Sequence, residues 1–213
     1  MHLLICAATE LEIKPFLESF KGKDLGKTKV LITGIGLLAS AYTITKEIIS
    51  SRPDLIIQAG IAGIIDDQLQ PRKVMLIRNE FVGDLGAMEN NRFNSLSDLQ
   101  LVHPGDFPWH SGKLSNKENF LNQFGYPLAD GVTVNEISTN RERINYYKEL
   151  GAQTESMEGA ALHFIGLKEN IPFLQLRALS NFAGERNKSQ WKMKESIENL
   201  NSALSDIIIK TLR

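Results

Sequence analysis

The feature that most constrains this chain is the regular alternation of short apolar runs with helix-like stretches. The apolar runs have the length of single β-strands, and the stretches between them show the spacing of amphipathic helices. In chain order, these segments are residues 3–8, 10–20, 29–33, 37–50, 54–60 and 74–83. A chain that alternates in this way is expected to form an α/β fold, with helices packed on a central sheet.

The second half of the chain returns to this alternation after a polar, turn-rich middle. Residues 84–127 show no sustained period, so we expect loops or an edge hairpin over a pocket there. A strand at 131–134, helices near 141–150 and 158–169, and a strand over 171–180 are expected to follow. Because no repeat or linker interrupts the chain, a single domain over residues 1–213 is predicted.

A last amphipathic helix is expected near the C-terminus, where it would cover one face of the sheet. Its apolar residues are spaced about one helical turn apart. They are Trp191, Ile197, Leu200, Leu204, Ile207, Ile208 and Leu212.

Charge and cysteine content exclude several classes of function. The chain has 24 Lys and Arg residues against 25 Asp and Glu, so neither a nucleic-acid face nor attraction to an anionic membrane is indicated. Its single cysteine, Cys6, lies in an apolar run, which excludes an internal disulfide and predicts a buried thiol. The longest apolar stretch, residues 55–65, is shorter than the roughly 18 residues of a membrane span. We therefore expect a cytoplasmic protein with a small-molecule partner, neither secreted nor inserted in a membrane.

One glycine motif imitates a dinucleotide-binding fingerprint. Gly34, Gly36 and Ala39 follow a predicted strand in G-x-G-x-x-A spacing, and Asp54 lies 20 residues beyond the first glycine. In a nucleotide-binding unit the acid ends the second strand, whereas Asp54 precedes its strand and would lie at the far edge of the sheet. We therefore interpret the glycines as a tight turn, or as a place where backbone approaches a ligand.

Four segments rich in glycine or polar residues lie at ends of predicted elements. Ligands of open α/β sheets bind beyond the carboxyl ends of the strands, so these segments are expected to border one crevice. They are CAATELE at 6–12, AGIAG at 59–63, ESMEG at 155–159 and RALSN at 177–181.

The polar residues of these segments also have structural interpretations. Thr9 followed by Glu12 matches a capping box, and Glu158 could favour a helix N-terminus through the helix dipole. Arg177 and Asn181 could form a salt bridge and a turn. However, Glu158 lies among small and apolar residues, where a solvated acid is rare, and the four side chains would converge at strand ends. This convergence favours a functional site.

Five segments in this order resemble the nucleoside phosphorylase and nucleosidase superfamily. They are AATELE, TGIG followed by a helix, AGIAG, SMEGAA and RALSN, and the likeness runs over nearly the whole chain. Their order and spacing are close to those of methylthioadenosine/S-adenosylhomocysteine nucleosidases. Within the superfamily, EFVGDLGAMEN and the Ser-Asn pair at 180–181 are similar to the futalosine hydrolases of the alternative menaquinone pathway.

The resemblance implies a three-layer α/β/α fold with a central mixed, twisted sheet, as in phosphorylases and related hydrolases. It implies hydrolysis of the N-glycosidic bond of futalosine, which releases hypoxanthine and dehypoxanthinyl futalosine. It also implies at least a homodimer, in which a neighbouring subunit closes the 5′ side of the pocket, with residues 103–113 as a candidate contributor. No cofactor is implied. The four histidines lack metal-ligand spacing, and the N-terminal region lacks a second phosphate loop, which favours water over phosphate as nucleophile.

By the same resemblance, Glu12 holds and helps to deprotonate the attacking water, and Arg177 helps to place it. Glu158 hydrogen-bonds the ribose hydroxyls and favours the cationic sugar, and Asn181 faces the base. Five further residues are expected to line the sugar and the base. They are Ala62, Gly63, Ser156, Met157 and Ser180.

The amide of Asn181 predicts which purine leaves. Relatives that release adenine carry Asp at this position, because a protonated carboxyl can donate toward N7 while its other oxygen accepts from the 6-amino group. In hypoxanthine, N7 and O6 are both acceptors, so the two N–H donors of an amide match them. No aromatic residue occurs at 132–138, where adenosine-type nucleosidases carry the residue that stacks on the base, so the stacking partner is undetermined.

Two alternatives stay open. An adenine-releasing nucleosidase that acts on methylthioadenosine or S-adenosylhomocysteine is disfavoured by Asn181. A non-catalytic nucleoside-binding protein is disfavoured by Glu12, Glu158 and Arg177, because binding alone has no use for a carboxylate that activates water.

Overall fold

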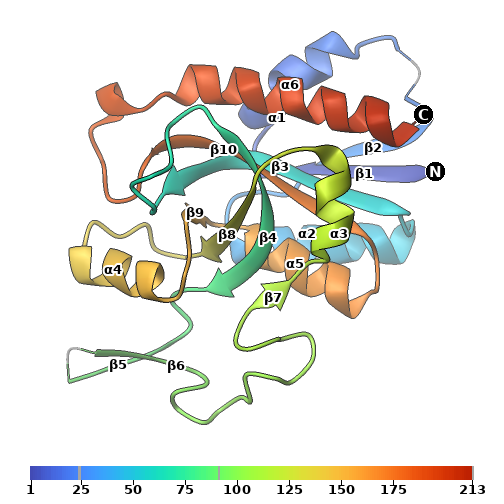
Figure 1. The fold of residues 1–213 in the computed structure, drawn as a ribbon. Coiled ribbons are helices and arrows are strands. Elements are labelled where there is room, and N and C mark those ends of the chain that lie inside the picture. Colours follow the sequence, from blue (N-terminus) through green and yellow to red (C-terminus); the bar gives the residue numbers. More distant parts are fainter. Residues whose placement is uncertain (24, 91, 213) are drawn as a thin grey trace.

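The computed structural model describes residues 1–23, 25–90 and 92–212, and its centre is a mixed sheet covered by helices on both faces (Figure 1). The order of the strands in the sheet is β10-β4-β8-β9-β3-β1-β2, with β7 paired to β4. An additional parallel pairing of β10 with β3 closes five of these strands into a ring. The strands are β1 (His2–Ala7), β2 (Lys27–Ile32), β3 (Leu55–Ile64), β4 (Val74–Val82), β7 (Leu114–Ser115), β8 (Leu128–Thr133), β9 (Thr154–Ser156) and β10 (Phe173–Phe182).

The helices form the two outer layers that the resemblance predicted. Helices α1 (Glu10–Ser19) and α6 (Met193–Leu212) pack on one face of the sheet, and α2 (Leu37–Ser50) and α5 (Gly159–Lys168) pack on the other (Figure 1). Two shorter helices, α3 (Glu118–Leu121) and α4 (Arg141–Glu149), lie outside these pairs.

Strand β1 shows why this chain folds in layers. Its side chains alternate between the faces, so that Leu3 and Ile5 join the core under α1 and α6, while Leu4 and Cys6 join the core under α2 and α5. A strand buried on both faces reads as a continuous apolar run, which is how this segment appears in the sequence. The prediction of a buried thiol at Cys6 is confirmed.

Two strands extend further than their apolar runs predicted, and the short strands β7 and β9 were not predicted. Strand β3 continues through Gly60 and Gly63 to Ile64, and β10 continues through Asn181 to Phe182. Strand β9 is only three residues long and polar, so its sequence gives no strand signal, but its backbone pairs with both β8 and β3. These strand ends are defined by partners across the sheet rather than by their own hydrophobicity.

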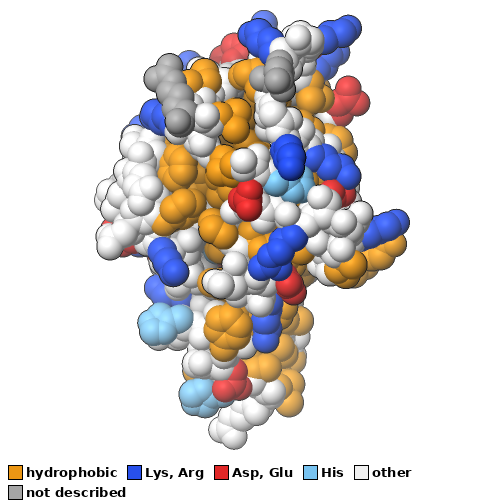
Figure 2. Space-filling model, turned by 90° about the vertical axis from the view of Figure 1, so that its right-hand side faces the viewer, with side chains coloured by type: hydrophobic (Ala, Val, Ile, Leu, Met, Phe, Trp, Pro, Cys, Tyr) orange, Lys and Arg blue, Asp and Glu red, His pale blue; other side chains and the backbone are white. Residues whose placement is uncertain are grey.

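The polar middle of the chain contains the hairpin that was expected, although at another place. Strands β5 (Gly86–Glu89) and β6 (Arg92–Ser95) pair with each other as a separate two-stranded sheet, not as an edge of the central one. This hairpin and the following loops project below the rest of the molecule in Figures 1 and 2. The face in Figure 2 shows Lys, Arg, Asp and Glu scattered among hydrophobic side chains.

The C-terminal helix has the predicted apolar stripe over most of its length. Five of the seven residues in that stripe, Ile197, Leu200, Leu204, Ile207 and Ile208, are buried. The prediction was wrong for the two ends, because Trp191 precedes α6 and Leu212 is 41% exposed. In the described part of the chain, no helix combines the length and the apolar character that crossing a membrane requires.

Candidate active site

A pocket of about 280 Å³ lies beyond the carboxyl ends of β1, β3 and β10, close to the lower limit of roughly 300 Å³ for small-molecule sites. Eight of the nine residues predicted to form the site line this pocket. They are Glu12, Ala62, Gly63, Ser156, Met157, Glu158, Ser180 and Asn181. The ninth, Arg177, is buried directly behind the pocket.

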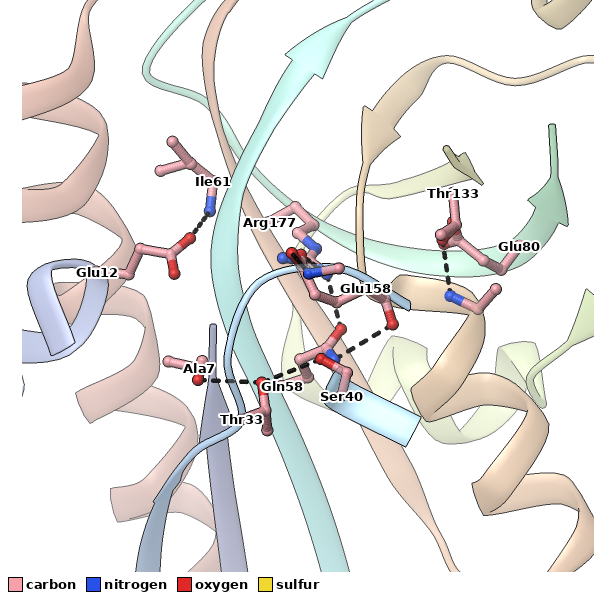
Figure 3. A network of polar contacts seen from close by, with 12 residues as sticks. Ala7, Glu12, Thr33, Ser40, Gln58, Ile61, Glu80, Thr133, Glu158 and Arg177 are labelled. Carbon is pink, nitrogen blue, oxygen red and sulfur yellow. Dashed lines mark hydrogen bonds and ion pairs between the residues drawn. The ribbon is translucent and has the colours of Figure 1, made fainter. Parts of the chain in front are cut away.

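Glu12 both belongs to the capping box of α1 and lines the pocket, which are the two roles that the sequence allowed. Its Oε2 accepts a hydrogen bond from the backbone N–H of Thr9 at 3.0 Å, as part of the predicted capping box of α1, and another from the Thr9 hydroxyl at 3.1 Å. Its Oε1 accepts from the backbone N–H of Ile61 in β3 at 3.1 Å (Figure 3). The carboxylate is therefore fixed between the first turn of α1 and strand β3, at the pocket wall.

Glu158 is the N-cap residue of α5 and meets the glycine turn at the start of α2. Its Oε1 accepts from the backbone N–H of Gly36 at 3.0 Å. Gly36 has a φ of 92°, in the region that favours glycine, and this conformation aims its N–H at the carboxylate. The glycine motif thus brings backbone toward an acid of the pocket.

Arg177 lies near Glu12 on the side of β3 to which Gly60 would point a side chain, and it pairs with Glu158 (Figure 3). Its Nη2 donates to the Gln58 side chain at 2.7 Å and lies 3.6 Å from Oε2 of Glu158. A Cβ on Gly60 would lie 2.2 Å from Nη1 of Arg177 and 3.0 Å from Oε1 of Glu12. Gly60 therefore leaves the space in which the guanidinium and the Glu12 carboxylate approach each other.

Ser180 and Asn181 lie at an irregularity in the pairing of β10 with β3. The Ser180 hydroxyl donates to Oδ1 of Asn181 at 2.7 Å, and Nδ2 of Asn181 donates to the Phe182 carbonyl at 2.9 Å. One of the two amide N–H groups is therefore occupied by backbone. In this conformation the amide has one N–H left for a ligand, and the expectation that both N–H groups face the base stays a prediction.

A second buried network supports the helix that carries Glu158. Thr133 donates from Oγ1 to Oε1 of Glu80 at 2.7 Å and accepts from the backbone N–H of Ala160 at 2.8 Å (Figure 3). Glu80 is fully buried, and this burial raises its pKa to about 7. The network fixes the first turn of α5 and thereby the position of Glu158.

Several residues of the pocket were missed by the sequence analysis. Trp191 lines it, and its indole Nε1–H donates to the Glu185 carbonyl at 3.0 Å, so the pocket has an aromatic wall outside the 132–138 segment. The charged side chains of Glu155 and Arg186 also line it. Trp191 was assigned to a helix stripe because its spacing fits one, and nothing in the spacing distinguishes a core residue from a pocket residue.

The segment expected to contribute to the 5′ side lies elsewhere within this chain. His103, Trp109 and Gly112 line a different, largely apolar cavity of about 240 Å³, together with Phe81 and Tyr146. None of the nine predicted site residues lines that cavity. Within residues 1–23, 25–90 and 92–212, no group of three or more His, Cys, Asp or Glu residues is placed to hold a metal ion.

The chain is similar to known proteins over nearly its whole length. The family model described as the phosphorylase superfamily matches residues 7–213. The chain is 28% identical to a futalosine hydrolase of Thermus thermophilus, over 96% of this chain and 94% of that protein. It is 24% identical to a futalosine hydrolase of Streptomyces coelicolor, over 97% of this chain and 95% of that protein.

Solved structures share the fold at lower sequence identity. The structure of a futalosine hydrolase of Helicobacter pylori superposes with a TM-score of 0.80 at 20% identity, over 99% of this chain and 98% of that one. A 5′-methylthioadenosine/S-adenosylhomocysteine nucleosidase of Neisseria meningitidis superposes with a TM-score of 0.80 at 16% identity, over 99% of both chains.

Proposed function

This chain belongs to the phosphorylase superfamily, and from that premise we propose that it is a purine nucleoside N-glycosidase that hydrolyses futalosine. The products are hypoxanthine and dehypoxanthinyl futalosine, an intermediate of menaquinone biosynthesis. The observation that carries the proposal is a single pocket lined by two carboxylates, Glu12 and Glu158, and by an amide, Asn181. The two futalosine hydrolases that match nearly the whole chain support the same substrate.

The chemistry follows from the charges that develop as the glycosidic bond breaks. The sugar becomes cation-like and the base takes up the electron pair, so negative groups near the sugar and donors near the base stabilise the transition state. Glu12, held by Thr9 and Ile61, accepts a proton from the attacking water. Glu158 faces the ribose and stabilises its positive charge.

Arg177 acts in this proposal chiefly as a positioning residue. It is buried behind the pocket wall, and its Nη2 lies 3.6 Å from Oε2 of Glu158 and donates to the Gln58 side chain. Its position next to Glu12 across Gly60 also brings positive charge to the side of the pocket where the water binds. Arg177 thus helps to place the water through its charge, from a buried position outside the pocket lining.

Recognition of the base rests on Asn181 and on the apolar walls. The free N–H of Asn181 donates to N7 or O6 of hypoxanthine, and rotation of the amide away from the Phe182 carbonyl would bring the second N–H to the base. Ala62, Gly63 and Met157 leave room for the sugar and the base, and Trp191 supplies the aromatic surface.

The proposal includes a homodimer in the cytoplasm. Leu11 and Ile35 line the pocket and are each 64% exposed, and Leu38 and Tyr42, one turn apart on α2, are also exposed. Exposed apolar side chains that line or adjoin the pocket favour cover by a second subunit. Sedimentation equilibrium is expected to give twice the mass of 23.8 kDa, and a monomer at micromolar concentration would contradict this part of the proposal.

Chromatography of the released base tests the main proposal. The protein is incubated with futalosine, inosine and methylthioadenosine, each with and without phosphate. We expect hypoxanthine from futalosine at a rate that phosphate does not change. Release of adenine from methylthioadenosine alone would instead favour the adenine-releasing alternative.

Glu158→Gln separates catalysis from binding in the same assay. If the chain only bound nucleosides, base release in the wild type would equal that in Glu158→Gln. We expect a large loss in the variant, because the amide cannot stabilise the positive charge on the sugar.

A further inference from the structure

Glu155 lies in the proposed pocket, although the mechanism above does not use it. It belongs to β9, where it pairs with Gly63 of β3, and Asn181 of β10 pairs with the same glycine from the other side. Residues in register on neighbouring strands point to the same face of a sheet. Glu155 and Asn181 therefore flank Gly63 and both line the pocket, with their Cα atoms about 9.5 Å apart by two strand spacings.

The carboxyl group of Glu155 lies close to Gly63. A Cβ on Gly63 would lie 3.5 Å from Oε1 of Glu155, so this oxygen lies over the side of β3 on which Gly63 carries no side chain. Glu155 is 6% exposed, and its Oε2 is buried without a hydrogen-bond partner among the residues that the structure describes. The residue lines the pocket, and a buried polar atom without a partner in such a residue calls for an explanation, of which a bound ligand is one.

The three carboxyl groups that line the pocket differ in what surrounds them. Both oxygens of Glu12 accept hydrogen bonds from N–H groups or a hydroxyl. In Glu158 one oxygen accepts an N–H and the other faces Arg177. Glu155 has neither arrangement in the described chain, so it is the carboxyl whose surroundings allow it to hold a proton.

The charges around Glu155 agree with this assignment. Burial is the largest effect and raises the pKa of Glu155 to about 7. Arg186, from the segment after β10, lowers this pKa, and Asp84, from the segment after β4, raises it. Tyr147 of α4 is also close enough for its own pKa to be raised by Glu155. At neutral pH a substantial fraction of Glu155 is therefore protonated.

The proposed hydrolysis needs a proton donor of this kind. When the bond between C1′ of the sugar and N9 of the base breaks, the electron pair stays on the base, and protonation of the base lowers the barrier to its departure. The amide of Asn181 can donate a hydrogen bond but cannot give up a proton at neutral pH. An acid from another position in the same pocket would complete the reaction.

We propose that Glu155 is a further catalytic residue, which gives its carboxyl proton to a ring nitrogen of the departing 6-oxopurine. The inference rests on the proposed function. Water forms a bond to C1′ while the C1′–N9 bond breaks, Glu12 takes a proton from the water, and hypoxanthine leaves as a neutral molecule. Glu155 is then a carboxylate and Glu12 is protonated, and proton exchange with solvent restores both groups.

The test compares two leaving groups in wild type and in Glu155→Gln. Futalosine releases a base that needs a proton, whereas p-nitrophenyl β-D-ribofuranoside releases a phenolate that leaves without one. We expect kcat/KM for futalosine to fall by about 10²–10⁴-fold, as for loss of a general acid. The value for the p-nitrophenyl riboside should change by less than about tenfold. Glu136→Gln, which changes an exposed glutamate outside the pocket lining, should leave both rates unchanged.

The pH profile gives a second readout that does not depend on the variant being stable. With wild type and futalosine, kcat/KM should fall as pH rises through about 7, because an acid must be protonated to act. In Glu155→Gln this alkaline fall should be absent. An equal loss on both substrates would indicate a structural role and overturn the inference, as would a wild-type profile that stays level from pH 6 to 9.

The outcomes separate this inference from the proposed function. If wild type releases no hypoxanthine from futalosine, the proposed function is wrong. If wild type is active and Glu155→Gln is equally active on futalosine, the proposed function stands and the role of Glu155 is wrong.

Discussion

Gly60 is the position where one added methyl group should disturb the site most directly. In Gly60→Ala the new Cβ would lie 2.2 Å from Nη1 of Arg177 and 3.0 Å from Oε1 of Glu12, whereas non-bonded heavy atoms prefer roughly 3.5–4.0 Å. Arg177 is 1% exposed and is held by Gln58, so the guanidinium cannot swing into solvent without losing its partners. The methyl group must therefore displace both charged groups.

The expected magnitude follows from this geometry. Overpacking of a well-packed interior costs about 1–3 kcal/mol of unfolding free energy, and each kcal/mol lowers Tm by roughly 2–4 °C in a chain of this length. A displacement of catalytic groups by about 1 Å can reduce kcat/KM by about 10²-fold. We expect losses of this size in both stability and futalosine hydrolysis.

Thermal denaturation and initial rates of hypoxanthine release measure these two effects. Gly63→Ala is the matched control for stability, because its Cβ would meet Glu155 at 3.5 Å and Ala183 at 3.7 Å, which are ordinary contacts. It should keep its Tm within about 2 °C of wild type. If Gly60→Ala were as stable and as active as wild type, the close approach of Arg177 and Glu12 across this glycine would be refuted.

Two further substitutions test base selection and the buried network. Asn181→Asp should lower hypoxanthine release by at least about 10²-fold, because an ionised carboxylate repels N7 and O6, and it should gain release of adenine from methylthioadenosine. Chromatography of the released base measures both effects. Intact hypoxanthine release without any gain on adenine nucleosides would contradict the pairing of Asn181 with the base. Burial raises the pKa of Glu80 from 4.5 to about 7, so the folded chain binds this proton more tightly than the unfolded chain does. The free energy of unfolding should therefore fall by about 3 kcal/mol as pH rises from 4.5 through 7. Chemical denaturation should therefore find Glu80→Gln more stable than wild type at pH 8 and nearly equal at pH 4.5, whereas an equal difference at both pH values would contradict a buried carboxyl that ionises in this range.

The alternation of strands and helices was predictable because each element buries its own apolar residues. The residues predicted for α2, 37–50, agree with the observed helix, since its amphipathic pattern is long and begins after a glycine turn. Strand β9 was not predictable, because its three polar residues are held by backbone pairing with β8 and β3. Local pattern carries no information about such partners.

The site was partly predictable, because some of its residues stand out from the local sequence pattern and others do not. Glu12, Glu158 and Asn181 stand out as polar residues at ends of apolar runs, and the structure brings them to one pocket. Glu155 escaped notice because it precedes Glu158 in a polar segment whose strand pairing was not foreseen. The single free N–H of Asn181 also depends on the Phe182 carbonyl, which only the bend of the backbone in β10 brings to the amide.

The arrangement of groups around the base is tested most directly by a crystal structure with hypoxanthine bound. The purine is expected over Gly63, with an N–H of Asn181 toward N7 or O6 and the carboxyl of Glu155 within hydrogen-bond distance of a ring nitrogen. Density for the base in the cavity beside Phe81 and Trp109, or in a pose that leaves Asn181 without a contact, would contradict the account.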